Sequence, residues 1–97
     1  MGLDALDLTF RLEKSLGYRL TRTDWQELFR PSATPSRWDC TAGEFHDWVC
    51  RRMRAAGRPV PFSSWRRVKI CISDVTGAAL AEIRKDACLI KDLGASF

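Results

Sequence analysis

Leucines recur at helical spacing in the first segment of the chain, and this pattern restricts the fold more than any other feature. Leu8, Leu12 and Leu16 lie four residues apart, and charged side chains occupy many of the positions between them. This spacing places the leucines on one face of an α-helix, which Leu6 and Phe10 widen and which must be buried against other elements. Gly17 can end the helix in a left-handed conformation. The pattern therefore predicts a helix over residues 3–16 that needs packing partners.

Two further segments have helix start signals. Thr21 or Thr23 can cap a short second helix, which Pro31 closes. Thr41 and Glu44 are spaced as in a capping box, in which each side chain accepts a hydrogen bond from the other residue's amide. We expect a third helix to follow this box and to end among arginines.

A fourth helix is expected after Ser63 or Ser64, because apolar residues then recur at helical spacing as far as Gly77. Residues 78–83 could add a weak turn, and no period holds over residues 84–97. No segment has a strand pattern with a partner, so the predicted class is all-α. The predicted parts of this single domain are three helices in 1–54, a linker over 55–62, and a fourth helix with a long loop in 63–97.

Composition is that of an ordinary globular protein. With 97 residues the chain is long enough for one domain with its own core. No apolar run approaches the roughly 20 residues of a membrane helix, and the first residues lack the basic and apolar parts of a signal peptide. We therefore expect a cytoplasmic protein without a membrane segment. The net charge of +4 mildly favours an acidic partner.

The cysteines and the histidine do not have the spacing of a metal or catalytic site. No Cys-x-x-Cys pair is present, so the four cysteines are expected to be free, with Cys71 and Cys88 buried among apolar neighbours. His46 has no catalytic partner at a recognisable spacing. We predict no enzymatic activity and no metal.

Tryptophans supply candidate core residues. Trp48 and Trp65 fall on apolar helix faces and are predicted to be buried. Trp38 lies in the loop before the third helix. It could anchor a partner or cover the core as a lid.

The two ends of the chain, joined tail to head, resemble the centre of acyl carrier proteins. Residues 92–95 are Asp-Leu-Gly-Ala, and residues 3–8 are Leu-Asp-Ala-Leu-Asp-Leu at the start of an amphipathic helix. In that family a similar loop, an Asp-Ser-Leu-Asp motif and an acidic helix follow one another. Residues 41–44, Thr-Ala-Gly-Glu, are similar to the entry into the last helix of the family. The resemblance implies a carrier-like four-helix bundle in circularly permuted order, with the last three helices first.

Two assemblies are compatible with this order. The linker over residues 55–62 can span about 25 Å at about 3.3 Å per residue, so one chain could close the bundle. Alternatively, the tail of one chain could complete a second copy in a segment-exchanged dimer. A monomer and an exchanged dimer both remain open.

The attachment position of the family lacks its serine. In acyl carrier proteins that serine bears phosphopantetheine. Alignment from the head places Gly2 there and alignment from the tail places Phe97, and neither has a hydroxyl. We therefore expect no bound cofactor. Ser96, one position earlier, is the alternative site for phosphopantetheine.

The resemblance also implies the partners. Carrier proteins dock on the enzymes of fatty-acid and polyketide-type synthesis through the helix that corresponds to residues 3–16. We therefore predict a non-catalytic protein-interaction module, and a genuine carrier modified at Ser96 is the alternative. The predicted docking residues are Leu3, Asp4, Asp7 and Arg11.

A rival function rests on basic residues around the linker. They would gather at one pole if the third and fourth helices pack antiparallel, and such a pole could bind nucleic acid or an acidic protein. No recognition-helix motif or stacking platform accompanies them, so we expect a solvated face and no nucleic-acid partner. The residues are Arg51, Arg52, Arg54, Arg58, Arg66, Arg67 and Lys69.

Overall fold

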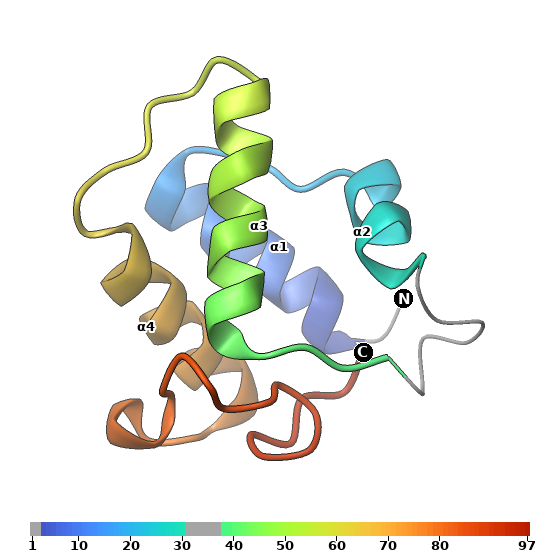
Figure 1. Cartoon of the computed structure of the whole chain (residues 1–97), viewed down its shortest axis with the longest axis vertical. Coiled ribbons are helices and arrows are strands. Elements are labelled where there is room, and N and C mark those ends of the chain that lie inside the picture. Colours follow the sequence, from blue (N-terminus) through green and yellow to red (C-terminus); the bar gives the residue numbers. More distant parts are fainter. Residues whose placement is uncertain (1–2, 31–37) are drawn as a thin grey trace.

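The computed structural model describes residues 3–30 and 38–97, without the side chain of Leu3. Within these ranges the chain forms four α-helices and no strand, which confirms the predicted all-α class. A short 3₁₀ turn, η2, follows the fourth helix (Figure 1). None of the described helices has the length and apolarity required to cross a bilayer. The helix bounds are Leu3–Leu16 for α1, Arg22–Phe29 for α2, Ala42–Ala55 for α3 and Ser64–Thr76 for α4, and η2 spans Leu80–Glu82.

Helix α1 has the predicted bounds, but its buried face is narrower than predicted, because Leu6 and Phe10 are exposed. Leu8 and Leu12 are each only 1% exposed, and Leu16 packs at the edge of the core. Gly17 ends the helix with a φ of +71°, a conformation that favours glycine. The buried face of α1 packs mainly against α4.

Capping boxes start both α2 and α3. Thr21, not Thr23, caps α2, and its hydroxyl accepts the amide of Asp24. At α3, the Thr41 hydroxyl accepts a hydrogen bond from the amide of Glu44, and the Glu44 carboxylate accepts one from the amide of Thr41. The predicted box at the start of α3 is therefore confirmed.

Helix α4 starts at the predicted place but without the predicted side-chain cap. Ser63 is the N-cap residue, yet its hydroxyl accepts from Arg67 Nε at 2.7 Å and makes no capping bond. The hydroxyl of Ser64 lies 2.9 Å from His46 on α3. Both serines are therefore used for other contacts. Gly77 ends the helix with a φ of +79°, as its position predicted.

Aromatic rings form the centre of the core. Trp25 is 1% exposed, and its ring packs near those of Phe29, Phe45 and Trp48. Its indole Nε1 donates to the hydroxyl of Thr9 at 2.8 Å, so the one polar group of this large side chain is paired.

The other two tryptophans differ in burial. Trp38 is 5% exposed and packs edge-on against Phe29, so it is a lid over the core, as one of the two predictions stated. Trp65 is only partly buried, which corrects the prediction of a core residue. Lys69 and Lys85 lie over its ring, each with Nζ 5.6 Å from the ring centroid.

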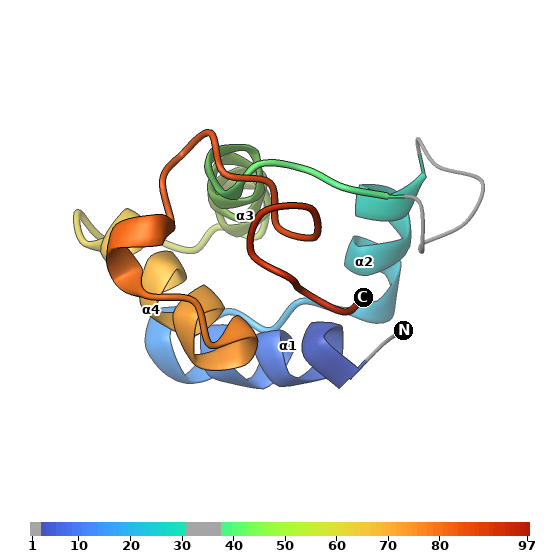
Figure 2. The ribbon, with the colours of Figure 1, turned by 90° about the horizontal axis from the view of Figure 1, so that it is seen from below.

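Residues 84–97 close one end of the helix arrangement (Figures 1 and 2). The segment is irregular, as its lack of a period predicted, but it carries core residues. Leu89 is 1% exposed and Leu93 is 7% exposed, and both belong to the same buried cluster as the helices. Between α3 and α4 the chain crosses in a linker over residues 56–63, one residue later than the predicted 55–62.

Four free cysteines are present, in agreement with their spacing. Cys71 is buried as predicted, whereas Cys88 is partly exposed. The prediction for Cys88 was wrong because its neighbours in sequence, Ala87 and Leu89, point to the core and leave the thiol between them nearer the surface.

An ion pair joins α2 to α3 inside the protein. The carboxylate of Asp24 is 2% exposed and pairs with Arg52, while the hydroxyl of Tyr18 donates to it at 3.1 Å. Burial alone would raise the pKa of Asp24, but hydrogen bonds from Thr21 and Arg52 outweigh it, so the pKa lies below its usual value of 3.8. The ionised form of Asp24 therefore favours the folded state.

Replacement of Asp24 by Asn should destabilise the protein by about 3 kcal/mol near neutral pH, because Arg52 then loses its buried partner. Since the pKa is lower in the folded state, this contribution is complete above pH 3.8 and is lost as the pH falls below that value. Urea unfolding of the unmodified chain and of Asp24→Asn at pH 7 and pH 3 measures the difference in their free energies of unfolding. A difference that is the same at both pH values would contradict the stabilising role of ionised Asp24.

Candidate functional site

The tail and the first helix meet where the two ends of the described chain adjoin. The carboxylate of Asp4, in the first turn of α1, accepts the backbone amide of Ser96 at 2.6 Å. The side chain of Ser96 is exposed. Figure 2 shows the end of the tail beside the start of α1. The segments that the sequence resemblance joined, residues 92–95 and the start of α1, are thus neighbours in space.

Phe97 is held in the aromatic cluster rather than in solvent. Its ring centroid lies 5.8 Å from that of Trp25, 5.3 Å from Trp38 and 6.3 Å from Phe29. A residue packed in this way anchors the end of the tail. The other candidate for the attachment position, Gly2, lies outside the described residues.

Backbone hydrogen bonds fix the tail on the start of α3. The amide of Ala42 donates to the carbonyl of Ala87 at 2.8 Å, and the amide of Leu89 donates to the carbonyl of Cys40 at 2.9 Å. The carboxylate of Asp39 accepts hydrogen bonds from the backbone amides of Ile90 and Lys91, at 2.9 and 3.1 Å. The first turn of α3 is therefore covered by the tail, which satisfies amides that a helix start leaves free.

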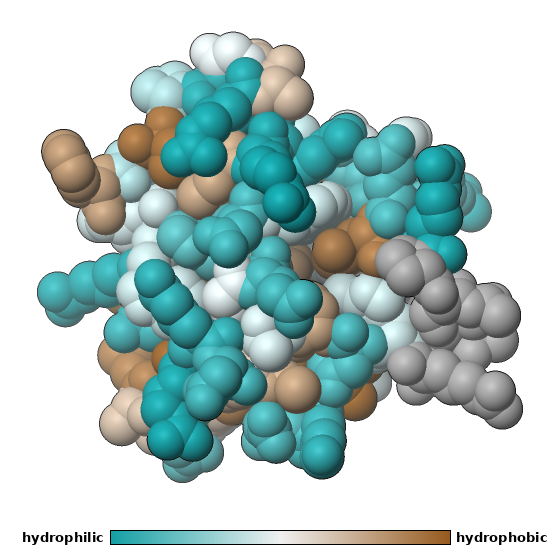
Figure 3. All heavy atoms as spheres, viewed as in Figure 1, coloured by the Kyte–Doolittle hydropathy of each residue, from teal (hydrophilic) through white to brown (hydrophobic). Residues whose placement is uncertain are grey.

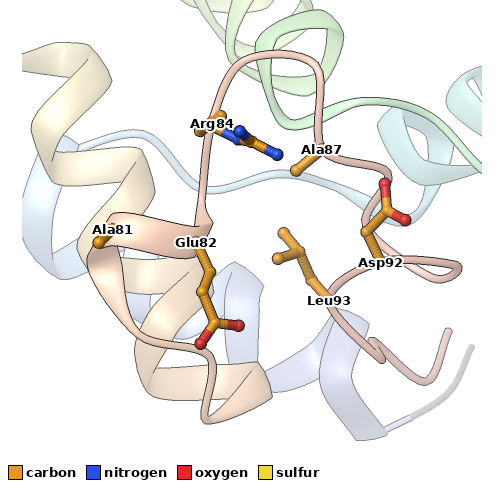
Figure 4. Close-up of a pocket in the computed structure, with 6 residues that line it drawn as sticks. All are labelled: Ala81, Glu82, Arg84, Ala87, Asp92 and Leu93. Atoms are coloured by element: carbon orange, nitrogen blue, oxygen red, sulfur yellow. The ribbon is translucent and has the colours of Figure 1, made fainter.

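A hollow of about 470 Å³ lies between η2 and the tail. Figure 4 shows Leu93 pointing into this space, with Glu82 and Arg84 on the opposite side and Asp92 at its margin. Its lining carries charged groups of both signs, and no hydroxyl, thiol or imidazole side chain is among the lining residues. The hollow is large enough for a small ligand, but its side chains do not indicate a reaction.

The outer face of α1 exposes apolar side chains. Leu6 is 46% exposed and Phe10 is 47% exposed, one turn further along the helix. Beside them Arg11 Nε lies 3.0 Å from Asp7 Oδ1, and Arg11 Nη1 lies 3.4 Å from Asp74 on α4. Of the predicted docking residues, Asp7 and Arg11 border this face, whereas the carboxylate of Asp4 faces the tail and accepts the amide of Ser96. The side chain of Leu3 lies outside the described part.

The basic residues do not all contribute to one pole. Arg52 turns to α2, where it pairs with Asp24 and Glu27. Arg67 donates to the carbonyl of Ser15 at 2.8 Å, and Lys69 lies over Trp65. The face in Figure 3, which α3 crosses, is mostly hydrophilic. Three of the seven predicted pole residues are thus held by contacts within the chain.

One cluster of polar side chains was missed by sequence reasoning. His46 Nε2 lies 2.9 Å from Ser64 Oγ and 3.3 Å from Cys50 Sγ. The spacing of four residues between His46 and Cys50 could have indicated that they share a face of α3. Ser64 could not have been found in this way, because it comes from the next helix.

Comparison with known proteins identifies no relative. No protein-family model, no curated protein sequence and no solved structure matches the chain. In the described part of the chain, His, Cys, Asp and Glu side chains form no group of three that could hold a metal ion.

Close packing between α3 and the tail gives a test of this arrangement. A Cβ atom at Gly43 would lie 2.9 Å from the carbonyl oxygen of Lys85. Alanine in an exposed helix usually stabilises by about 1 kcal/mol relative to glycine. Gly43→Ala should instead destabilise by about 1 to 3 kcal/mol, because the tail backbone has to move. Thermal unfolding measures the change, and a raised melting temperature would show that the tail does not pack here.

Proposed function

We propose that this chain is an acyl-carrier-like interaction module in circularly permuted order, which acts without a phosphopantetheine arm. The observation that carries the proposal is the contact between Ser96 and Asp4, with its N···O distance of 2.6 Å. This contact puts residues 92–95 directly before α1 in space, which is the order of the corresponding segments in a carrier protein. The packing of α1 against α4 further supports the match, because these would be the central and first helices of the carrier fold.

The environment of Phe97 supports the absence of the arm. Phosphopantetheine must extend into solvent from its serine to reach partner enzymes. At the position that the tail alignment assigns to this serine, the chain has a phenyl ring packed among Trp25, Phe29 and Trp38. A side chain of this kind stabilises the core and offers no oxygen for a phosphodiester bond.

The outer face of α1 is the surface that fits a protein partner. Leu6 and Phe10 form an exposed apolar pair, and the ion pair of Asp7 and Arg11 borders it. Apolar centres with polar borders are typical of protein interfaces. Partners would be the carrier-recognising enzymes of fatty-acid or polyketide-type synthesis, and the charges of both signs would guide docking.

Modification at Ser96 is the second candidate function. Its side chain is exposed, and its backbone is fixed against the first turn of α1 by Asp4. An exposed hydroxyl at the start of this helix has the location from which a carrier presents its arm. Ser96 is therefore the residue at which a genuine carrier would be modified.

Incubation with coenzyme A and a broad-specificity phosphopantetheinyl transferase separates the two candidates. We expect the intact mass to remain unchanged, because the attachment position has no hydroxyl. Ser96→Ala is the matched control. A gain of one phosphopantetheine that disappears in Ser96→Ala would replace the first proposal by the second.

The docking face can be tested with two leucines of nearly equal exposure. Leu6→Glu on α1 should weaken binding to a carrier-recognising ketosynthase by more than about tenfold, because a charge then enters the centre of the interface. Leu80→Glu on η2 should leave binding unchanged, since Leu80 is 47% exposed but lies off α1. Calorimetric titration of the enzyme measures both affinities. Absence of binding by the unmodified chain, or equal losses in both variants, would refute the proposed docking face.

A further inference from the structure

The cluster of His46, Cys50 and Ser64 has no role in the proposed function, and its geometry favours thiol chemistry. Cys50 and His46 are one turn apart on α3, and their Sγ and Nε2 atoms are 3.3 Å apart. A thiol within hydrogen-bond reach of an imidazole can transfer its proton and become a nucleophilic thiolate. Ser64 Oγ lies 2.9 Å from the same Nε2 atom, so the hydroxyl and the thiol share this nitrogen.

The surroundings of His46 keep its imidazole unprotonated before the reaction. Asp47 Oδ1 lies 3.9 Å from Nδ1, beyond the reach of a direct hydrogen bond. Burial lowers the pKa of His46; Asp47 acts in the opposite direction, and Lys85 and Arg54 lower the pKa further. The imidazole is therefore neutral near pH 7, which is the protonation state that a base requires.

A cavity of about 330 Å³ reaches this cluster from the surface. Cys50, His46 and Ser64 line it together with Val60 from the linker. Arg51 and Arg54 complete the lining from the exposed side of α3, and among the described residues neither forms an ion pair with a carboxylate. Asp47 is the one acidic residue that lines this cavity. The entrance therefore favours a small anionic molecule.

We propose that Cys50 is a nucleophilic thiol that exchanges with a small anionic disulfide bound beside Arg51 and Arg54. His46 takes the proton from Cys50 Sγ, and the thiolate attacks one sulfur of the disulfide. A bond forms between Cys50 Sγ and that sulfur, the original S–S bond breaks, and the departing thiolate takes the proton from His46. The products are a mixed disulfide on Cys50 and one free thiol, so atoms and electrons balance. This inference does not depend on the proposed carrier-like function.

The other three thiols provide internal controls. Burial and nearby carboxylates raise the pKa of Cys40 to about 12. Burial is also the main cause that raises the pKa of Cys71, and desolvation together with Asp39 and Asp92 raises that of Cys88. Each of these thiols has a smaller thiolate fraction than an ordinary cysteine and should react slowly.

Mass spectrometry of the folded full chain, after timed incubation with oxidised glutathione, tests the proposal. Cys50 should be modified before the other cysteines, at a rate higher by about tenfold or more. His46→Gln should slow the reaction with both oxidised glutathione and neutral 2-hydroxyethyl disulfide, because the base is lost. First modification of any other cysteine, or an unchanged rate in His46→Gln, would overturn the proposal.

The arginines are tested separately by charge. The double variant Arg51→Gln with Arg54→Gln should slow the reaction with oxidised glutathione by about tenfold and leave that with the neutral disulfide unchanged. Arg58→Gln with Arg66→Gln removes two exposed cations that do not line this cavity and should change neither rate. Equal effects of the two double variants would overturn the anion site.

The pH dependence of the Cys50 modification rate tests the role of His46 even if His46→Gln does not fold. With His46 as base, the modification rate of Cys50 in the unmodified chain should become independent of pH between pH 6 and pH 8. An unassisted thiol would instead react about ten times more slowly for each unit by which the pH is lowered over that range. That result would overturn the role of His46.

Discussion

Docking of the tail on the start of α3 is the interaction on which the rest of the structure depends. The amides of Ala42 and Gly43 donate to carbonyl groups of the tail, and the tail amide of Leu89 donates back to Cys40. These bonds satisfy polar groups at a helix start and at the same time direct Leu89 and Leu93 into the core. Without them, one end of the helix arrangement would expose its apolar side chains to water.

The same docking places the end of the tail against the aromatic cluster. Phe97 adds a ring beside Trp25 and Trp38, and Asp4 holds the preceding amide at the start of α1. The end of the tail is therefore part of the core packing, and a hydrogen bond to the Asp4 carboxylate fixes it to the first turn of α1.

Contacts within the chain hold several polar side chains of the protein, and these contacts determine where its charges act. Arg52 is drawn to Asp24 and away from the surface that its neighbours Arg51 and Arg54 line. The hydroxyl of Ser63 contacts Arg67 and that of Ser64 contacts His46, so neither caps α4. A uniform basic pole is thereby replaced by a smaller cationic entrance beside Cys50.

Local patterns predicted the helices well because caps and periodicity depend on residues close in sequence. The leucine stripe gave the bounds of α1, and the capping box of Thr41 and Glu44 gave the start of α3. The choice between Thr21 and Thr23 was left open, since both have a hydroxyl that could accept the required amide.

Long-range contacts were not predictable in the same way, because they depend on which surfaces the core brings together. Nothing in the local sequence of Trp65 distinguishes a buried ring from one covered by Lys69 and Lys85. The meeting of His46 with Ser64 depends on the path of the linker between their helices. The sequence by itself determined the four helices and the capping box of α3, through interactions over a few residues. The tertiary structure decided the place of Phe97 and the partners of Arg52 and Cys50, because burial forces each polar group to find a partner wherever the packing provides one.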